Sequence, residues 1–175
     1  RAETLSLLEF LNSTSLGVIQ GSPGMGKALT TWMHICDQMT TDNNYKAIWL
    51  NAISNTFTII HNGNIWNEHH DDWTELDYTD VHYIVIDGIT EQSHYDKAFV
   101  FAIGKHDEGC SFVYLITSAQ VHIKNTHLRI NDGKPFFMKA WESEDFISAI
   151  ANDNFFYSVL SFLLPEGLSY NSTTN

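Results

Sequence analysis

One stretch constrains the fold of this chain more than any other, because it combines three local signals in a fixed order. The apolar run 16–20 is typical of a buried strand, residues 21–27 follow the pattern Gly-x-x-x-x-Gly-Lys, and residues 28–39 are compatible with a helix. A glycine loop between a strand and a helix turns successive backbone N–H groups toward a phosphate chain at the positive end of the helix. This order of strand, loop and helix predicts a phosphate-binding site.

The residues of this loop would share the contacts to the ligand. Those predicted to bind the nucleotide are Gly21, Ser22, Pro23, Gly24, Met25, Gly26, Lys27, Ala28 and Leu29. Lys27 would bring a mobile positive charge to the outer phosphates, and the glycines would let the backbone approach them closely. The residue after Lys27 is normally a Ser or Thr that holds Mg²⁺, and here it is Ala28. The pattern therefore indicates nucleotide binding more firmly than hydrolysis; the alternative is a purely structural glycine-rich turn.

A second element of such a site follows further along the chain. Residues 81–88 form a hydrophobic run that ends in an acid, Asp87. Asp87 would leave the sheet beside the glycine loop and hold a Mg²⁺-bound water, so it is the predicted metal-binding residue. A buried strand that simply ends in Asp at a turn is the alternative. Together, in this order, the two elements predict an α/β P-loop fold, with a mainly parallel sheet flanked by helices.

Other polar residues near these elements are candidates for catalysis. Glu91 is the predicted catalytic residue, because it lies on the loop after Asp87 and would orient the attacking water; a solvated loop acid is the alternative. Ser118 or Thr117, at the end of a later buried strand, would sense the outermost phosphate, or else satisfy local backbone groups. The position after Asp87, where many ATPases have a catalytic Glu, is Gly88. Hydrolysis is therefore expected to be weak or absent.

Helices and strands alternate along the rest of the chain. The predicted strands are 45–51, 56–60, 64–66, 111–118 and 135–138, and the predicted helices are 5–11, 27–40, 96–104, 144–151 and 154–164. Asn62-Gly63 between two strands predicts a β-hairpin, inserted between βα units. Residues 67–80 are polar, and Trp73 and Leu76 are the expected packing points of a short helix there. The domain is predicted to span residues 1–165, followed by a flexible tail at 166–175.

Charge and composition limit the partners. The hydrophobic fraction of 43% is that of a folded domain. The net charge of −12, with nine Lys and Arg, argues against direct nucleic-acid contact through a broad basic face, whereas a nucleotide needs only a local pocket. No apolar run approaches the ~20 residues of a membrane span, so no membrane partner is expected. Cys36 and Cys110 are expected to be buried thiols, with a disulfide as the alternative.

A metal site is less well supported elsewhere in the chain. The run His69-His70-Asp71-Asp72 contains metal-binding residue types, but neighbouring side chains in an extended segment point apart. A solvated loop is therefore expected there. The chain opens at Arg1 rather than Met, as a fragment of a longer protein would.

Four segments, in their order along the chain, carry a family resemblance. They are GSPGMGK at 21–27, YIVIDG at 83–88, LITS at 115–118 and FMKAW at 137–141. In these segments the chain resembles the P-loop NTPase domain of Crinkler effectors of oomycetes and fungi, which is related to retrotransposon hot spot proteins. The hairpin at 56–66 also sits where that family inserts one, and the likeness runs from about residue 10 to 165.

The resemblance implies more than the residues alone. It implies an NTPase module that binds ATP or GTP with Mg²⁺ and that, in full-length members, often adjoins a nuclease-like domain. It also implies secretion into a host, action in the host nucleus and a host protein partner; without it, a soluble intracellular protein is expected. Two other functions remain open: a non-enzymatic interaction scaffold with a degenerate loop, and an accessory module of a DNA-acting effector.

Overall fold

The structure is a computed structural model that describes residues 2–41, 44–73 and 80–140, together with the single positions 142, 144 and 151. Residues 1–140 form one compact unit and residues 141–175 a second, of which only the three single positions are described. The helices predicted at 144–151 and 154–164 therefore lie outside the described residues, apart from residues 144 and 151, and so does Leu76. The predicted extent of the domain, 1–165, stays a prediction.

The first unit is built on one seven-stranded sheet with the strand order β4-β3-β2-β5-β6-β1-β7. The strands are β1 Leu16–Gln20, β2 Lys46–Asn51, β3 Thr56–His61, β4 Asn64–His69, β5 Tyr83–Ile89, β6 Phe112–Thr117 and β7 Lys134–Phe137. Strands β2, β5, β6, β1 and β7 run parallel to one another, and the β3–β4 hairpin adds two antiparallel pairings beside β2. The predicted α/β class with a mainly parallel sheet flanked by helices is confirmed.

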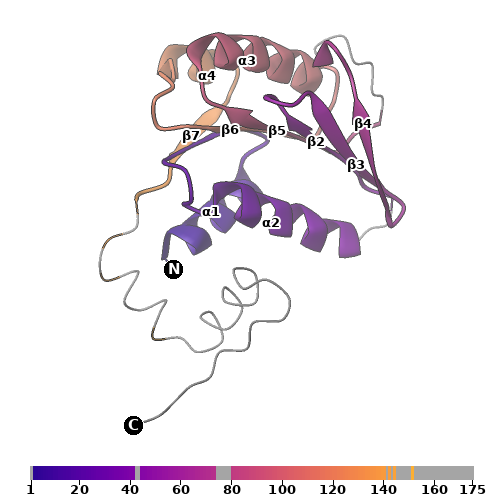
Figure 1. Cartoon of the computed structure of the whole chain (residues 1–175), viewed down its shortest axis with the longest axis horizontal. Coiled ribbons are helices and arrows are strands. Elements are labelled where there is room, and N and C mark those ends of the chain that lie inside the picture. Colours follow the sequence, from indigo (N-terminus) through magenta and orange to yellow (C-terminus); the bar gives the residue numbers. More distant parts are fainter. Residues whose placement is uncertain are drawn as a thin grey trace, which may run out of the picture. The chain divides into compact units, whose positions relative to one another are not determined.

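Helices cover both faces of this sheet. They are α1 Ala2–Ser13, α2 Lys27–Thr41, α3 Gln92–Asp107 and α4 Asn125–Ile130. Helices α1 and α2 lie on one face and α3 and α4 on the other (Figure 1). Successive strand side chains point to opposite faces, so Val18 packs in the cluster with α3 while Ile19 packs in the cluster with α1 and α2. The continuous apolar runs of the central strands follow from this burial on both faces.

The predicted hairpin is present, and its turn has the expected chemistry. Asn62 and Gly63 both have positive φ, 52° and 72°, as a two-residue turn of the primed type requires. Strand β4 continues to His69, three residues beyond the predicted end, because its ladder with β3 persists as far as the Thr56–His69 pair. The hairpin is inserted in the sequence between β2 and β5, as predicted, and its pairing with β2 makes it one edge of the main sheet.

Two helices differ from the prediction. Helix α3 begins at Gln92 and ends at Asp107, so it extends beyond both ends of the helix predicted at 96–104. Lys105 is buried within this helix, and its ammonium lies 2.6 Å from a carboxylate oxygen of Glu108. Because the charge is paired while the aliphatic stem is buried, the helix can continue through this lysine. Helix α4 was not predicted; it has six residues, and the periodicity of so short a segment is not visible in the sequence.

The strand order decides where functional side chains meet. Strand β6 lies between β1 and β5, so Asp87, near the end of β5, belongs to a strand two positions away from β1, which leads into the glycine loop. Because β1, β5 and β6 are parallel, their carboxyl ends lie along one edge of the sheet. The loop after β1, Asp87 and the end of β6 therefore lie together at this edge.

Candidate functional site

The loop between β1 and α2 needs glycine at particular positions. Gly24 and Gly26 have φ of 78° and 85°, a left-handed conformation that other L-residues rarely adopt. Gly21 is required for a different reason: a Cβ there would sit 2.8 Å from the carbonyl oxygen of Met138. Met138 comes this close because its N–H donates to the carbonyl of Gln20 at 2.8 Å. The glycines of the motif thus shape the path of the backbone itself.

Lys27 is the first residue of α2 and folds back over its own loop. The residue is 8% exposed, and its Nζ donates to the carbonyl oxygens of Gly21 and Ser22, each at 2.8 Å. Burial lowers the pKa of Lys27, and the Asp87 carboxylate acts in the opposite direction. The ammonium is therefore held at the mouth of the loop by two neutral acceptors, which a more strongly charged ligand could replace.

Asp87 lies in an irregular part of β5. The β5–β6 register shifts between Ile86 and Ile89, and Gly88 has a φ of 81°. The Gly88 N–H donates to Oδ1 of Asp87 at 2.7 Å. Burial raises the pKa of Asp87, against the opposing effects of the Gly88 N–H and the Lys27 ammonium. A Glu at position 88 would be strained by the positive φ, so the glycine here belongs to the shape of the strand.

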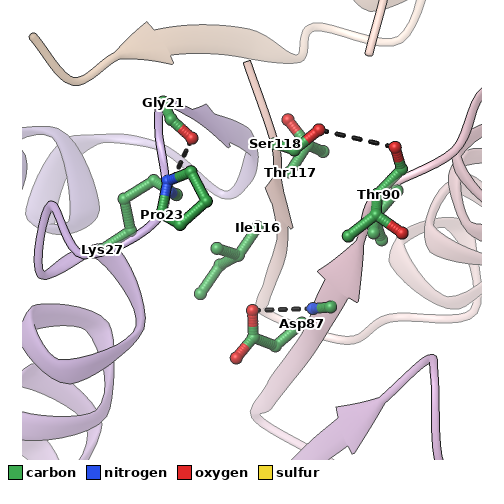
Figure 2. Close-up of a pocket in the computed structure, with 10 residues that line it drawn as sticks. Gly21, Pro23, Lys27, Asp87, Thr90, Ile116, Thr117 and Ser118 are labelled. Carbon is green, nitrogen blue, oxygen red and sulfur yellow. Dashed lines mark hydrogen bonds between the residues drawn. The ribbon is translucent and has the colours of Figure 1, made fainter. Parts of the chain in front are cut away.

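Two cavities are lined by the residues at this edge. The larger, about 390 Å³, is lined by residues 23–29 together with Asp87 and Ile116. The smaller, about 150 Å³, shares Pro23, Lys27, Asp87 and Ile116 with the larger and adds Gly21 and the ends of β5 and β6. Figure 2 shows Lys27 and Asp87 on opposite sides, with Ile116 between them and Thr117 near the end of β6. An ammonium and a carboxylate from distant parts of the sequence therefore line the same space.

Most of the predicted site residues are brought together here, and two are not. Every predicted loop residue except Ser22 lines one of the two cavities, and so do Asp87 and Ser118. Ser22 takes part only through its carbonyl, which accepts from Lys27. Glu91 is exposed at the N-cap of α3 and lines neither cavity. The roles assigned to these residues stay predictions.

At the end of β6, the hydroxyls of Thr117 and Ser118, between which the sequence analysis left the choice open, differ in their hydrogen bonds. Ser118 has local backbone partners: its Oγ accepts from the N–H of Gln120 at 3.3 Å and lies 3.5 Å from the carbonyl of Thr90. The Oγ1 of Thr117, in contrast, is buried and has no hydrogen-bond partner among the described residues, although Thr117 lines the smaller cavity. A buried hydroxyl without a partner costs free energy, which a bound acceptor would recover.

Gln20 was missed by the sequence analysis. Its amide nitrogen donates to the carbonyl of Ser118 at 3.1 Å and to that of Val121, so it ties the end of β1 to the segment after β6. The available signal was a polar residue that ends a buried apolar strand directly before the loop. Both partners are backbone carbonyls about a hundred residues away, which no local pattern indicates.

Thr117→Val tests whether this hydroxyl is kept for a ligand. Valine has the shape of threonine without the hydroxyl, so we expect the empty protein to keep its stability or gain up to about 1 kcal/mol. Urea unfolding measures this, with Ser118→Ala as the control variant at the neighbouring hydroxyl. A loss of stability larger than about 1 kcal/mol would show that the Thr117 hydroxyl has a partner in solution.

Asp87→Asn tests the buried carboxyl through the pH dependence of stability. The raised pKa of Asp87 means that the folded state binds this proton more tightly than the unfolded chain does. The stability of the wild type relative to Asp87→Asn should therefore fall as the pH rises from the ordinary value of 3.8 through the raised value, and then level off. Thermal unfolding from about pH 3 to about pH 8 measures the difference. If the stability of the wild type relative to Asp87→Asn instead rose with pH over this range, the raised pKa of Asp87 would be wrong.

Other candidate chemistry is limited within the part of the chain that the structure describes. No group of three or more His, Cys, Asp or Glu side chains there could hold a metal ion. In the segment 69–72, His70 lies 3.3 Å from Glu68 and Asp72 lies 3.1 Å from Lys97. Cys36 and Cys110 are free thiols, half-buried and buried respectively. Among the described helices, none has both the length and the apolar character to cross a membrane.

Comparison with known proteins places the chain in no family. No family model and no curated protein matches it. Among solved structures, it is similar to a large terminase from a thermophilic bacteriophage, with a TM-score of 0.48 and 8% sequence identity. The match covers 94% of this chain and 50% of the terminase chain, so the chain spans about half the length of that protein. A likeness at this level carries no argument about activity.

Proposed function

We propose that the two cavities bind the phosphate chain of a nucleoside triphosphate, ATP or GTP, and that hydrolysis is slow or absent. The observation that carries the proposal is that Lys27 and Asp87, from α2 and β5, line the same two cavities beside a loop shaped by glycines. Loop N–H groups at the start of a helix favour an anion, and Lys27 adds a full positive charge. The buried Thr117 hydroxyl, which has no partner among the described residues, could donate to the outermost phosphate.

Weak hydrolysis follows from what stands at three positions. Ala28 has no hydroxyl at the start of α2, Gly88 has no carboxylate after Asp87, and Glu91 lines neither cavity. Each well-placed contact to a transition state is typically worth ~2–4 kcal/mol, so the lack of a hydroxyl at position 28 and of a carboxylate at position 88 should together slow turnover severely. A role for Glu91 in orienting water would require its exposed side chain to turn toward the cavities. Any Mg²⁺ that arrives on the nucleotide would have Asp87 as its nearest acidic ligand in this lining.

Titration calorimetry on the whole chain tests this function. ATP, GTP and inorganic tripolyphosphate should each give a one-to-one binding heat, because the recognised group is the phosphate chain. Phosphate release, followed over hours, should stay near the uncatalysed background. If none of the three ligands binds with a Kd below about 1 mM, the proposed function is wrong.

One observation favours the scaffold alternative. The Lys27 ammonium already donates to the Gly21 and Ser22 carbonyls, so the empty loop is stable without a ligand. A chain that gave no binding heat but unfolded cooperatively would fit this second function, an interaction scaffold with a degenerate loop. The third function, an accessory module of a DNA-acting effector, has no supporting contact among the described residues.

The biological context rests on the four sequence segments alone. We propose a Crinkler-type effector on their resemblance, and secretion, the host nucleus and a host protein partner follow only from that family. The upstream and downstream sequence of the intact gene product would test this context most directly. A translocation region before residue 1 or a nuclease domain after residue 175 would support it, and an unrelated enzyme domain in either place would contradict it.

A further inference from the structure

The ligands available at the start of α2 do not fit a Mg²⁺ ion held by the protein. Mg²⁺ requires oxygen ligands in a near-ideal octahedral arrangement. The residue that follows Lys27 is Ala28, and it lines the larger cavity. Its methyl group supplies no oxygen at the position where this type of loop usually offers a hydroxyl.

The next two hydroxyls on α2 do not take over this role. Thr31 is fully buried, and its Oγ1 donates to the carbonyl of Lys27, one turn back, at 2.9 Å. Thr30 is also buried, and neither threonine is among the residues that line the two cavities. Helix α2 therefore presents its backbone N–H groups and Lys27 to the ligand, but no hydroxyl of its own.

Across the cavities, Asp87 is a weak substitute as a metal ligand. It is the single carboxylate among the described residues that line the two cavities, and one of its two oxygens already accepts the Gly88 N–H at 2.7 Å. Ordered Mg²⁺ sites on nucleotides usually combine such a carboxylate with a loop hydroxyl. With the hydroxyl replaced by Ala28, the metal would gain little from this protein.

Direct contacts to phosphate oxygens remain available without a metal. The loop with its left-handed glycines, the helix start and the Lys27 ammonium would all contact phosphate oxygens directly. A Mg²⁺ ion on the nucleotide would occupy some of the same oxygens and reduce the negative charge that Lys27 recognises. The loop, the helix start and Lys27 therefore offer contacts to the phosphate chain that do not require the metal.

We propose that this site binds the metal-free nucleoside triphosphate at least as tightly as its Mg²⁺ complex. The inference rests on the proposed function, because it describes the form of the ligand that the same cavities take. It gives the absence of hydrolysis a physical reason: the bound species lacks the ion that neutralises charge on the transferred phosphoryl group. The nucleotide would then act on this protein through binding alone and not through the energy of its hydrolysis.

The test compares ATP affinity in excess EDTA with that in excess Mg²⁺, by calorimetry on the whole chain. We expect the Kd in EDTA to equal or fall below the Kd in Mg²⁺. A wild-type chain that binds Mg-ATP more tightly than free ATP, by more than the error of the two Kd values, would overturn the inference and leave the proposed function standing. If neither form binds, the proposed function itself fails, and this inference with it.

Variants at position 28 supply the matched comparison. Ala28→Ser and Ala28→Thr restore the hydroxyl, so Mg²⁺ should then tighten ATP binding by about tenfold relative to EDTA. Ala28→Val has the shape of threonine without the oxygen, so whatever its bulk does to the affinity itself, the ratio of its ATP affinities in Mg²⁺ and in EDTA should match that of the wild type. If Mg²⁺ changed the ATP affinity of the Thr and Val variants equally, the missing hydroxyl at position 28 would not explain the weak binding of the metal. The wild-type comparison decides the inference even where a variant does not fold.

Discussion

Replacing Lys27 with alanine should lower the affinity for ATP by about 10- to 100-fold. A hydrogen bond to a charged group is worth about 1.5–3 kcal/mol, and Lys27 is the one cation among the described residues that line the two cavities. The same change removes the donors to the Gly21 and Ser22 carbonyls, so some stability should be lost as well. A fluorescent ATP analogue measures the binding, and urea unfolding measures the stability.

Lys105→Ala is the control that separates these two effects. Lys105 is as buried as Lys27, at 8% exposure, and its ammonium pairs with Glu108, but it lines neither cavity. The control should lose stability and keep the affinity of the wild type. A folded Lys27→Ala protein with unchanged affinity would show that the ammonium does not contact the phosphates.

Replacing Gly21 with alanine should destabilise the protein by about 1–3 kcal/mol. The new Cβ would lie 2.8 Å from the Met138 carbonyl oxygen, which is backbone and is held by the Met138–Gln20 hydrogen bond. Either β7 or the loop must shift. Because Gly21 also carries one of the acceptors of Lys27, a shift of the loop should weaken nucleotide binding at the same time.

Gly104→Ala provides the opposite control in α3. A Cβ at Gly104 meets no described atom within 4 Å, and the position is helical, so alanine should raise stability by about 0.5–1 kcal/mol. Thermal or urea unfolding of the two variants side by side compares the effects directly. Destabilisation of both variants by the same amount would contradict the steric explanation for Gly21.

The local elements were largely predictable from the sequence. The strand, loop and helix at 16–41 have unambiguous signals, namely a short apolar run, glycines and a lysine at a helix start. The Asn62-Gly63 turn was predicted because few residues other than Asn and Gly adopt positive φ easily. Helix ends were less predictable, since the burial of Lys105 that extends α3 depends on packing against Phe101 and on Glu108.

The candidate site was only partly predictable. Lys27 and Asp87 were identified from their motifs, but the choice between Thr117 and Ser118 depended on which hydroxyl has a backbone partner. Gln20 was not identified, because its partners lie about a hundred residues away. Glu91 was proposed from its position on a loop, and its exposure at the start of α3 separates it from the cavities.

The sequence by itself determined the fold class and the position of the glycine loop. Both depend on local properties, namely the spacing of apolar residues and the conformational freedom of glycine. Only the tertiary structure decided that β6 separates β1 from β5, and that Lys27, Asp87 and Thr117 line the same cavity. Strand order is set by packing on both faces of the sheet, and the pairing partners of a strand are not encoded in its own residues. For this reason the motifs were visible in the sequence, while the arrangement of their residues around one cavity was not.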